Sequence, residues 1–428
     1  MAINSKNKVP EFSIEQEQNE FAASTEREKI KGSKNLNVPP LRFPEFTDEW
    51  TDTTIGSIAT VVGGGTPDTT QKDNWDGNIL WYTPSEIGKE KYLSDSERRI
   101  TNIGLKSSGA KLLPKGTILL TSRATIGECS IAAYECSTNQ GFQSLIANQG
   151  VNNEFLFYLV ASKRRELLKR ACGSTFLEIS ANEVRKIKVK SPSIDEQNKI
   201  ASLLALIDER IATQSRIIDK LQSLIKGIIQ RLVHDGLEKE TWHKVMLSEI
   251  LSERNELNIE YYPVHSVSVS VGIVNQVEYL GRSFAAKDTA HYNVVKYGDI
   301  VYTKSPTGNQ PFGIIRQSQC QNSVAVSPLY GVYKPDSFEI GNILHYYFLN
   351  PLNTNNYLFP LIQKGAKNTI NITNRRFLEN SIPLPISNDE ILSVSKALSS
   401  LNTKIVLENN TLYTLLKQKR YLLNMLFI

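Results

Sequence analysis

The sequence is short of the residues from which metal sites, disulfides and membrane spans are built. Its 428 residues include four cysteines and five histidines, with no CxxC pair and no cluster at metal-ligand spacing. We therefore expect Cys129, Cys136, Cys172 and Cys320 to be reduced structural thiols, and the chain to hold no metal. No apolar run is long enough to cross a bilayer, so no membrane partner is expected. Residues 1–6 lack the apolar core of a signal peptide, which predicts a cytoplasmic protein.

Sequence motifs for catalysis are missing as well. No GxxxxGK[ST] motif is present, so nucleotide hydrolysis is not expected. Residues 63–67 look like a phosphate-binding loop, but Pro67 and the polar residues after it do not predict a helix N-terminus. Residues 309–312 are similar to the base-holding loop of amino-methyltransferases, but Gln310 replaces its first proline, which favours a surface turn. The histidines and carboxylates form no nucleophile–base or nuclease pattern. We therefore expect a chain that is not an enzyme and binds no cofactor itself.

What the sequence does contain is a pair of matching heptad seams. From 195 to 233, seam positions recur at alternating steps of four and three, and all are apolar except Gln214. They are Ile200, Leu204, Ile207, Ile211, Gln214, Ile218, Leu221, Ile225, Ile228 and Leu232. A shift of 194 residues gives the second seam: Val394, Leu398, Leu401, Ile405, Glu408, Leu412, Leu415, Lys419, Leu422 and Leu426. One such helix alone would be expected to cover its own domain, whereas a matching pair predicts two helices that pack on each other.

The polar residues of these seams predict the register of the pair. Gln214 and Glu408 occupy equivalent positions at the midpoints of 195–233 and 389–427. In an antiparallel pair they would face each other, and one buried polar contact would fix the alignment. Lys419, which replaces the equivalent of Ile225, is expected at the edge of the seam with its ammonium in water.

The rest of the chain is also duplicated. Trp242 follows Trp50 by 192 residues, and the strand predicted at 298–303 matches the one at 116–121. Between such anchors the halves barely agree, which suggests one scaffold with two different recognition surfaces; duplication followed by simple drift is the alternative. We predict a flexible tail at 1–40, globular domains at 41–193 and 236–387, and coiled-coil helices at 194–235 and 388–428. A single helix is expected from Asn153 to Cys172.

Several predicted loops combine the side chains that DNA recognition requires, with amides and hydroxyls for base edges and cations for phosphates. The net charge of +5 permits nucleic-acid binding without demanding it. The candidate residues are Thr66, Lys72, Ser122, Arg123, Gln140, Ser174, Thr175, Lys304, Ser305, Asn309, Lys367, Asn368, Asn374 and Arg375. Arg123 and Lys304 follow matching strands at nearly equivalent turns, which makes them the best pair. For any one of these residues, an ordinary solvated loop position is the alternative.

Several motifs, taken in order, resemble the specificity subunits of type I restriction–modification enzymes. They are Leu41-Arg42-Phe43-Pro44-Glu45-Phe46 with Trp50, Gly65-Thr66-Pro67, the Gly-x-Ile-Leu-Leu-Thr-Ser-Arg stretch at 116–123, Asn139-Gln140-Gly141-Phe142, Asp195-Glu196-Gln197, Gly298-Asp299-Ile300-Val301-Tyr302 and Val326-Ser327-Pro328-Leu329-Tyr330. The resemblance runs from about Leu41 to the C-terminus. The sequence departs from the pattern at Asp389-Glu390-Ile391, which lacks the usual Gln, and at 1–38, which precede the usual start.

The resemblance implies an α+β protein with two target-recognition domains, each a mixed β-rich α/β globule. Two long antiparallel coiled-coil helices would join them in a pseudo-twofold arrangement. Each domain would read one part of a split, asymmetric site in double-stranded DNA. Two modification subunits would carry S-adenosylmethionine and methylate adenine, while restriction subunits, with ATP and Mg, would translocate and cut the DNA. A free-standing methyltransferase and a coiled-coil scaffold that binds no DNA are the two alternatives.

Overall fold

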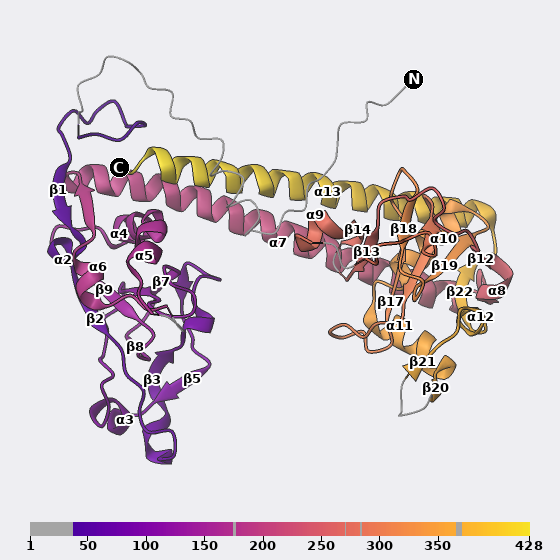
Figure 1. Cartoon of the computed structure of the whole chain (residues 1–428), viewed down its shortest axis with the longest axis horizontal. Helices are drawn as coiled ribbons and strands as arrows, with labels where there is room; N and C mark the ends of the chain where they lie inside the picture. The colour runs from indigo at the N-terminus through magenta and orange to yellow at the C-terminus, as the bar shows by residue number, and fades with distance from the viewer. Residues whose placement is uncertain (1–36, 174–176, 270, 283–284, 365–369) are drawn as a thin grey trace. The chain divides into compact units, whose positions relative to one another are not determined.

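The computed structural model describes residues 37–173, 177–269, 271–282, 285–364 and 370–428 (Figure 1). Its described residues form two compact units. The first unit comprises residues 37–213 together with 413–428, and the second comprises 214–412. Each unit therefore contains part of each of the two longest helices, α7 (Ile194–Glu238) and α13 (Asn388–Met425).

The helix pair is antiparallel in both units. In the first unit, Ile200 and Leu204 near the start of α7 share a core with Leu426, just beyond the end of α13. In the second unit, Ile218 and Ile225 of the later part of α7 share a core with Val394, Leu398 and Ile405 of the earlier part of α13. The start of one helix thus packs on the end of the other. The predicted heptad helices and their antiparallel pairing are confirmed.

Gln214 and Glu408 form the predicted contact, whereas Lys419 does not lie in water as predicted. The side-chain amide of Gln214 donates hydrogen bonds to the carboxylate of Glu408 and to its main-chain carbonyl, the latter at 3.0 Å. The prediction for Lys419 is wrong, because its Nζ lies 2.7 Å from a carboxylate oxygen of Asp208 and only 29% of its side chain is exposed. A lysine at the edge of an apolar seam reaches the nearest carboxylate when one lies within the length of its side chain.

The first unit contains a five-stranded sheet of order β2-β9-β6-β7-β4, a three-stranded sheet of order β5-β3-β8, and the pair β1–β10. These strands are β1 (Thr51–Thr54), β2 (Ala59–Gly63), β3 (Trp75–Tyr82), β4 (Tyr92–Leu93), β5 (Arg98–Ile100), β6 (Ile118–Leu120), β7 (Cys129–Ala132), β8 (Cys136–Thr138), β9 (Gln143–Ala147) and β10 (Lys188–Ser191). Its shorter helices are α2 (Ile55–Ile58), η1 (Lys72–Asn74), η2 (Pro84–Glu86), α3 (Asn102–Lys106), α4 (Asn153–Ser162), α5 (Arg164–Arg170) and α6 (Ala181–Arg185).

The helix expected from Asn153 to Cys172 is in fact two helices. α4 is capped by the Asn152 side chain, which accepts a hydrogen bond from the Phe155 N–H. The chain leaves helical geometry at Lys163 and resumes it in α5. Six consecutive residues of α4, 155–160, are buried, and α4 lies beside α7 in the first unit (Figure 1). The break lets α5 turn while the main core, which contains Phe155 and Leu159, stays closed.

The second unit contains a four-stranded sheet of order β12-β19-β16-β17 and the pairs β11–β22, β13–β14, β15–β18 and β20–β21. These strands are β11 (Trp242–Met246), β12 (Leu251–Glu253), β13 (His265–Ser268), β14 (Gly272–Asn275), β15 (Asn293–Val295), β16 (Ile300–Thr303), β17 (Ile314–Gln317), β18 (Val324–Val326), β19 (Gly331–Pro335), β20 (Gln363–Lys364), β21 (Ile370–Asn371) and β22 (Ser381–Pro385). Its shorter helices are α8 (Leu247–Ile250), α9 (Gln276–Leu280), α10 (Phe338–Tyr347), α11 (Pro351–Leu358), η3 (Phe359–Leu361) and α12 (Asn374–Phe377).

The two units share a common set of strands in the same order and differ in the other strands that pair around it. The order β2-β9-β6-β7 in the first unit repeats as β12-β19-β16-β17 in the second, and the pair β1–β10 repeats as β11–β22. Beyond this common set, β8 of the first unit pairs parallel with β3, whereas β18 of the second unit pairs antiparallel with β15. The inserted strands are therefore where the two halves of the sequence diverge.

Candidate nucleic-acid interface

Each unit is tied to the start of a long helix by a tryptophan and a glutamate. In the first unit, Trp50 Nε1 donates to Glu196 at 3.2 Å, and both Nε and Nη2 of Arg42 donate to the same carboxylate at 2.8 Å. In the second unit, Trp242 Nε1 donates to Glu390 at 2.7 Å. These repeated contacts fix where each recognition unit begins relative to its helix.

Four loops of the first unit are joined edge to edge through the main chain. The Gly65 N–H donates to the Thr138 carbonyl at 2.9 Å, and the Ser122 N–H donates to the Gly141 carbonyl at 2.7 Å. The Ile179 N–H in turn donates to the Ser122 carbonyl at 3.1 Å. Segments far apart in sequence, at 63–66, 138–141, 122–125 and 177–179, therefore lie next to one another.

Within the glycine run at 63–65, Gly64 and Gly65 serve close packing. A Cβ atom at Gly64 would lie 2.0 Å from the Asn139 carbonyl oxygen, and one at Gly65 would lie 2.3 Å from the Ala110 nitrogen. The Trp81 indole also donates to the Gly65 carbonyl at 3.0 Å. These close contacts explain Gly64 and Gly65 without a phosphate ligand.

The candidates of the first unit differ in exposure. Thr66 and Gln140 are both exposed, and the Thr66 hydroxyl donates to the Gln140 side-chain carbonyl. Lys72 is exposed on η1, after a turn that Asn74 and Trp75 hold through hydrogen bonds to the Asp68 carbonyl. Thr66, Gln140 and Lys72 are therefore placed to meet a ligand.

Ser122 requires a correction. Its side chain is fully buried and its hydroxyl has no partner, so it cannot reach a base edge. Arg123 beside it is 45% exposed, with Nε 2.9 Å from the Glu178 carboxylate. Ser174 and Thr175 lie outside the described residues.

In the second unit, Lys304, Ser305 and Asn309 follow β16 in a loop closed by mutual main-chain hydrogen bonds of Thr307 and Gln310. Ser305 and Asn309 are exposed. Lys304 is half-buried, and this burial lowers the pKa of its ammonium, although the nearby Glu253 carboxylate opposes the shift. The lysine thus remains close to a carboxylate of its own unit.

One of the two α12 candidates, Asn374, contacts the Glu253 carboxylate. The Asn374 side-chain amide donates to Glu253 at 2.6 Å, and the Tyr333 hydroxyl donates to the Asn374 carbonyl at 3.1 Å. Asn374 is half-buried with its side-chain oxygen unpartnered, while Arg375 is exposed. Lys367 and Asn368 lie outside the described residues, between β20 and β21. Glu253 and Glu178, which hold these candidates in place, were not singled out from the sequence because isolated glutamates carry no local signal.

The comparisons with known proteins agree on one family. Residues 47–223 match the model of the type I restriction modification DNA specificity domain. The chain is 32% identical over 271 residues to the type I restriction enzyme MjaIX specificity subunit of Methanocaldococcus jannaschii, covering 59% of this chain and 62% of that protein. It is 26% identical over 175 residues to the EcoR124I/EcoR124II specificity subunit of Escherichia coli, covering 39% of this chain and 43% of that protein. Each of these matches is to a type I restriction–modification specificity subunit or its domain, and the chain is similar to that family.

The fold is similar to that of a solved S subunit. The crystal structure of a type I restriction–modification S subunit from M. genitalium superposes with a TM-score of 0.55 and 16% identity, covering 91% of this chain and 99% of that one. The alignments with the two curated relatives span less than two thirds of either relative's own length.

The matching strands of the two units refine one candidate pair. Ile118 of β6 pairs with Leu145, and Ile300 of β16 pairs with Tyr333. Counting from these equivalent pairs, Lys304 corresponds to Ser122 and Ser305 corresponds to Arg123. Arg123 and Lys304 are therefore one position out of register, and the matched positions carry different chemistry in the two units.

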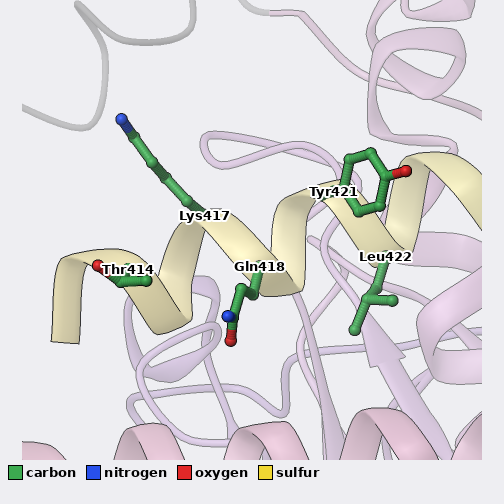
Figure 2. Close-up of a pocket in the computed structure, with 5 residues that line it drawn as sticks. All are labelled: Thr414, Lys417, Gln418, Tyr421 and Leu422. Atoms are coloured by element: carbon green, nitrogen blue, oxygen red, sulfur yellow. The ribbon is translucent and has the colours of Figure 1, made fainter. Parts of the chain in front are cut away.

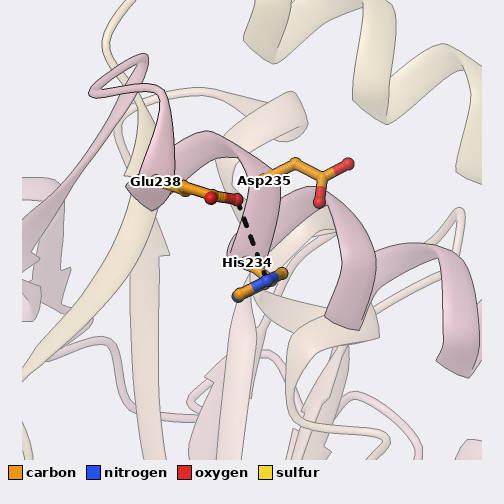
Figure 3. Close-up of side chains that lie close together, drawn as sticks. All are labelled: His234, Asp235 and Glu238. Carbon is orange, nitrogen blue, oxygen red and sulfur yellow. Dashed lines mark ion pairs between the residues drawn. The ribbon is translucent and has the colours of Figure 1, made fainter.

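Two further features of the described residues lie on the long helices. A shallow hollow of about 390 Å³ is lined by Thr414, Lys417, Gln418, Tyr421 and Leu422, all from one helix, α13 (Figure 2). His234, Asp235 and Glu238 lie together near the end of α7 (Figure 3), with 78% and 71% of the His234 and Glu238 side chains exposed. Asp235 is instead paired with Arg231 at 3.5 Å. Among the described helices, none is long and apolar enough to span a membrane.

Proposed function

We propose that this chain is a specificity subunit that reads a bipartite, asymmetric target in double-stranded DNA, one part with each unit. It thereby directs adenine methylation by two modification subunits and cleavage by restriction subunits. The observation that carries the proposal is the repeated strand order β2-β9-β6-β7 and β12-β19-β16-β17, combined with different strands inserted in each unit. A common strand arrangement that carries different additional strands in each unit suits the reading of two different half-sites.

The exposed candidate side chains are the proposed contacts. In the first unit they are Thr66, Lys72, Arg123 and Gln140, and in the second Ser305, Asn309 and Arg375. The amides and hydroxyls suit base edges, while the cations suit phosphates or the acceptors of guanine. Asn374 would contribute after exchanging its hydrogen bond to Glu253 for one to DNA. Lys304, whose ammonium is favoured by the charge of Glu253, would contribute as a cation.

The long helices are the proposed spacer. The 45 residues of α7 and the 38 of α13 correspond to about 68 and 57 Å at the ordinary helical rise. One turn of B-DNA is about 34 Å. Helices of this length suit half-sites separated by an unread gap, and the gap would follow helix length. The recognition domains would be the exchangeable segments 41–193 and 236–387, with 194–235 and 388–428 as the spacer and 1–40 as a tail.

The proposed partners would dock partly on the outer faces of the helices. Ile217 and Leu224 lie one heptad apart on α7, with 38% and 48% of each residue exposed. Tyr421, which lines the hollow on α13, is 56% exposed. Apolar residues at heptad spacing outside the seam suit further helices. S-adenosylmethionine, ATP and Mg would then be bound by the modification and restriction subunits.

A DNA-binding assay with the modification partner tests this proposal. The complex should bind a duplex that carries its bipartite site more tightly than a duplex with either half scrambled. A scaffold without DNA recognition would show no sequence preference in this assay. A free-standing methyltransferase would bind S-adenosylmethionine without any partner, and we expect no such binding.

A further inference from the structure

The side chain of Asp208 on α7 joins three elements of the first unit. One carboxylate oxygen lies 2.7 Å from Lys419 Nζ of α13, and the other accepts a hydrogen bond from the Tyr158 hydroxyl of α4 at 2.6 Å. Only 17% of the Asp208 side chain is exposed. Both oxygens of a largely buried carboxylate are thus used to connect the helix pair to α4.

The network continues to the edge of the sheet. Lys91, next to β4, donates to the Tyr158 hydroxyl at 2.9 Å and to Glu154 of α4 at 2.9 Å. The Tyr92 hydroxyl of β4 donates to the same glutamate. Lys91 Nζ also lies 4.8 Å from the centre of the Tyr158 ring. A continuous polar network therefore connects α13, α7, α4 and β4.

Among the described residues, this polar network anchors α7 to the rest of the first unit at a second point, farther along the helix. The first anchor lies at the helix start, where Glu196 binds Arg42 and Trp50 and Gln197 accepts the Asn152 N–H. Asp208 comes twelve positions later, which is about 18 Å along the helix. One anchor fixes the position of the unit at one point of the helix, whereas two separated anchors also fix the angle between the unit and the helix. Apolar packing between them is not directional.

The second unit has an anchor of different chemistry at this place. The shift of 194 residues takes Asp208 to Asn402, which is exposed, and takes Lys419 back to Ile225, which is buried in the second core. There the Asn342 amide of α10 instead donates to the hydroxyls of Ser395 and Ser399 at 2.9 and 2.8 Å. The charged anchor thus belongs to the first unit.

We propose that Asp208, with Lys419 and Tyr158, is a positioning residue that fixes the angle of the first recognition unit on its helices and so restricts the length of the unread DNA gap. This inference rests on the proposed reading of a bipartite site. The residues do not touch DNA. Loss of the anchor leaves both half-site sequences unchanged and broadens the gap lengths that the complex accepts.

The test uses the full chain with its modification partner and duplexes whose half-sites are constant while the gap is shortened or lengthened by one base pair. Wild type should methylate one gap length strongly. Asp208→Asn, which keeps the volume and removes the charge, should raise the relative methylation of the altered gaps roughly tenfold, the effect of one charge-assisted hydrogen bond. Glu209→Gln, at an exposed neighbouring position, is the matched control and should behave as wild type. Lys419→Met should act like Asp208→Asn, and Lys419→Arg should restore the wild-type preference.

A second measurement is independent of catalysis. Hydrogen exchange of the full chain should show faster exchange of the main-chain amides of α4 and β4 in Asp208→Asn than in Glu209→Gln, with the second unit unchanged. If the Asp208 and Lys419 variants lose thermal stability yet keep the wild-type gap preference, the residues are only stabilising and the inference is overturned. If the wild-type complex methylates DNA without needing two half-sites, the proposed function fails, and the inference fails with it.

Discussion

The side-chain amide of Gln214 donates to both the carboxylate and the main-chain carbonyl of Glu408 across the helix pair. The carboxylate is also 2.5 Å from Lys404 Nζ, and the lysine and the amide together hold the pKa of Glu408 below its ordinary value. The residues on either side in the two seams are apolar. A polar contact between otherwise apolar neighbours favours the one alignment of the helices in which its two partners face each other.

Replacing both residues tests the register directly. In Gln214→Leu/Glu408→Leu the centre of the seam becomes apolar, so we expect a higher thermal unfolding midpoint together with a less specific alignment. Spin labels at exposed Glu209 and Lys417 should report one distance in the wild type and a broader distribution in the double variant. One unchanged narrow distance in the double variant would show that register is set elsewhere.

The last residues of the chain complete the first unit. Leu426 and Phe427 are 1% and 6% exposed, and the Phe427 ring lies 5.5 Å from that of Phe155. Phe427→Ala should lower the free energy of unfolding of this unit by about 3–5 kcal/mol, because it leaves a cavity in a packed core. Hydrogen exchange should localise the loss to the first unit. Tyr421→Ala, at a 56% exposed position of α13, should have little effect.

The pair of Arg42 and Glu196 is expected to be costly to break. Glu196 is 2% exposed and accepts two hydrogen bonds from Arg42. Arg42→Met should lower the stability of the first unit by about 3 kcal/mol in urea denaturation, since it leaves a buried carboxylate with only the Trp50 indole as partner. Lys199→Met, which removes an exposed ion pair with Glu45, is the control and should change stability little.

His345 gives the second unit a dependence on pH. Its Nδ1 accepts the Gln317 N–H at 3.1 Å, and burial, with a contribution from Arg316, lowers the pKa of the imidazole to about 3. The folded state therefore favours the neutral ring. Above pH 6.5 its stabilising effect is complete, and it is lost as pH falls from 6.5 towards 3, because the unfolded chain binds a proton that the folded chain does not.

The measurement is the stability of the second unit between pH 7 and pH 4.5. Wild type should lose up to about 1.4 kcal/mol per pH unit from this group below pH 6.5. His345→Gln keeps an acceptor for the Gln317 N–H but does not titrate, so its slope should be smaller. His234→Gln, at a 78% exposed side chain, should retain the wild-type slope. Equal slopes for wild type and His345→Gln would contradict the assignment.

The sequence predicted the elements that depend on periodicity. The heptad seams around Gln214 and Glu408 identified both long helices, their direction and their register, because a repeated apolar spacing leaves few alternatives. The duplicated landmarks, such as Trp50 and Trp242, identified the repeated arrangement of strands. Both tryptophans do hold equivalent glutamates on the long helices.

What the sequence did not predict depends on contacts between distant segments. The sequence around Lys419 does not predict its ion pair with Asp208, and the sequence around Lys304 does not predict the influence of Glu253. Each carboxylate comes from another part of the chain. Ser122 follows a strand as an exposed loop residue would, yet its main chain bonds to Gly141 and Ile179 and encloses the side chain. Local polarity therefore predicts a loop and leaves open which of its side chains faces solvent.

Mapping methylated adenines in a host that carries this chain and its modification partner tests the central claim most directly. Wild type should produce one motif with two specified parts separated by a gap of constant length. Replacing residues 41–193 by the corresponding segment of another family member should change one part of the motif and leave the other part and the gap intact. A change in both parts would contradict the account of two separately reading units on one spacer.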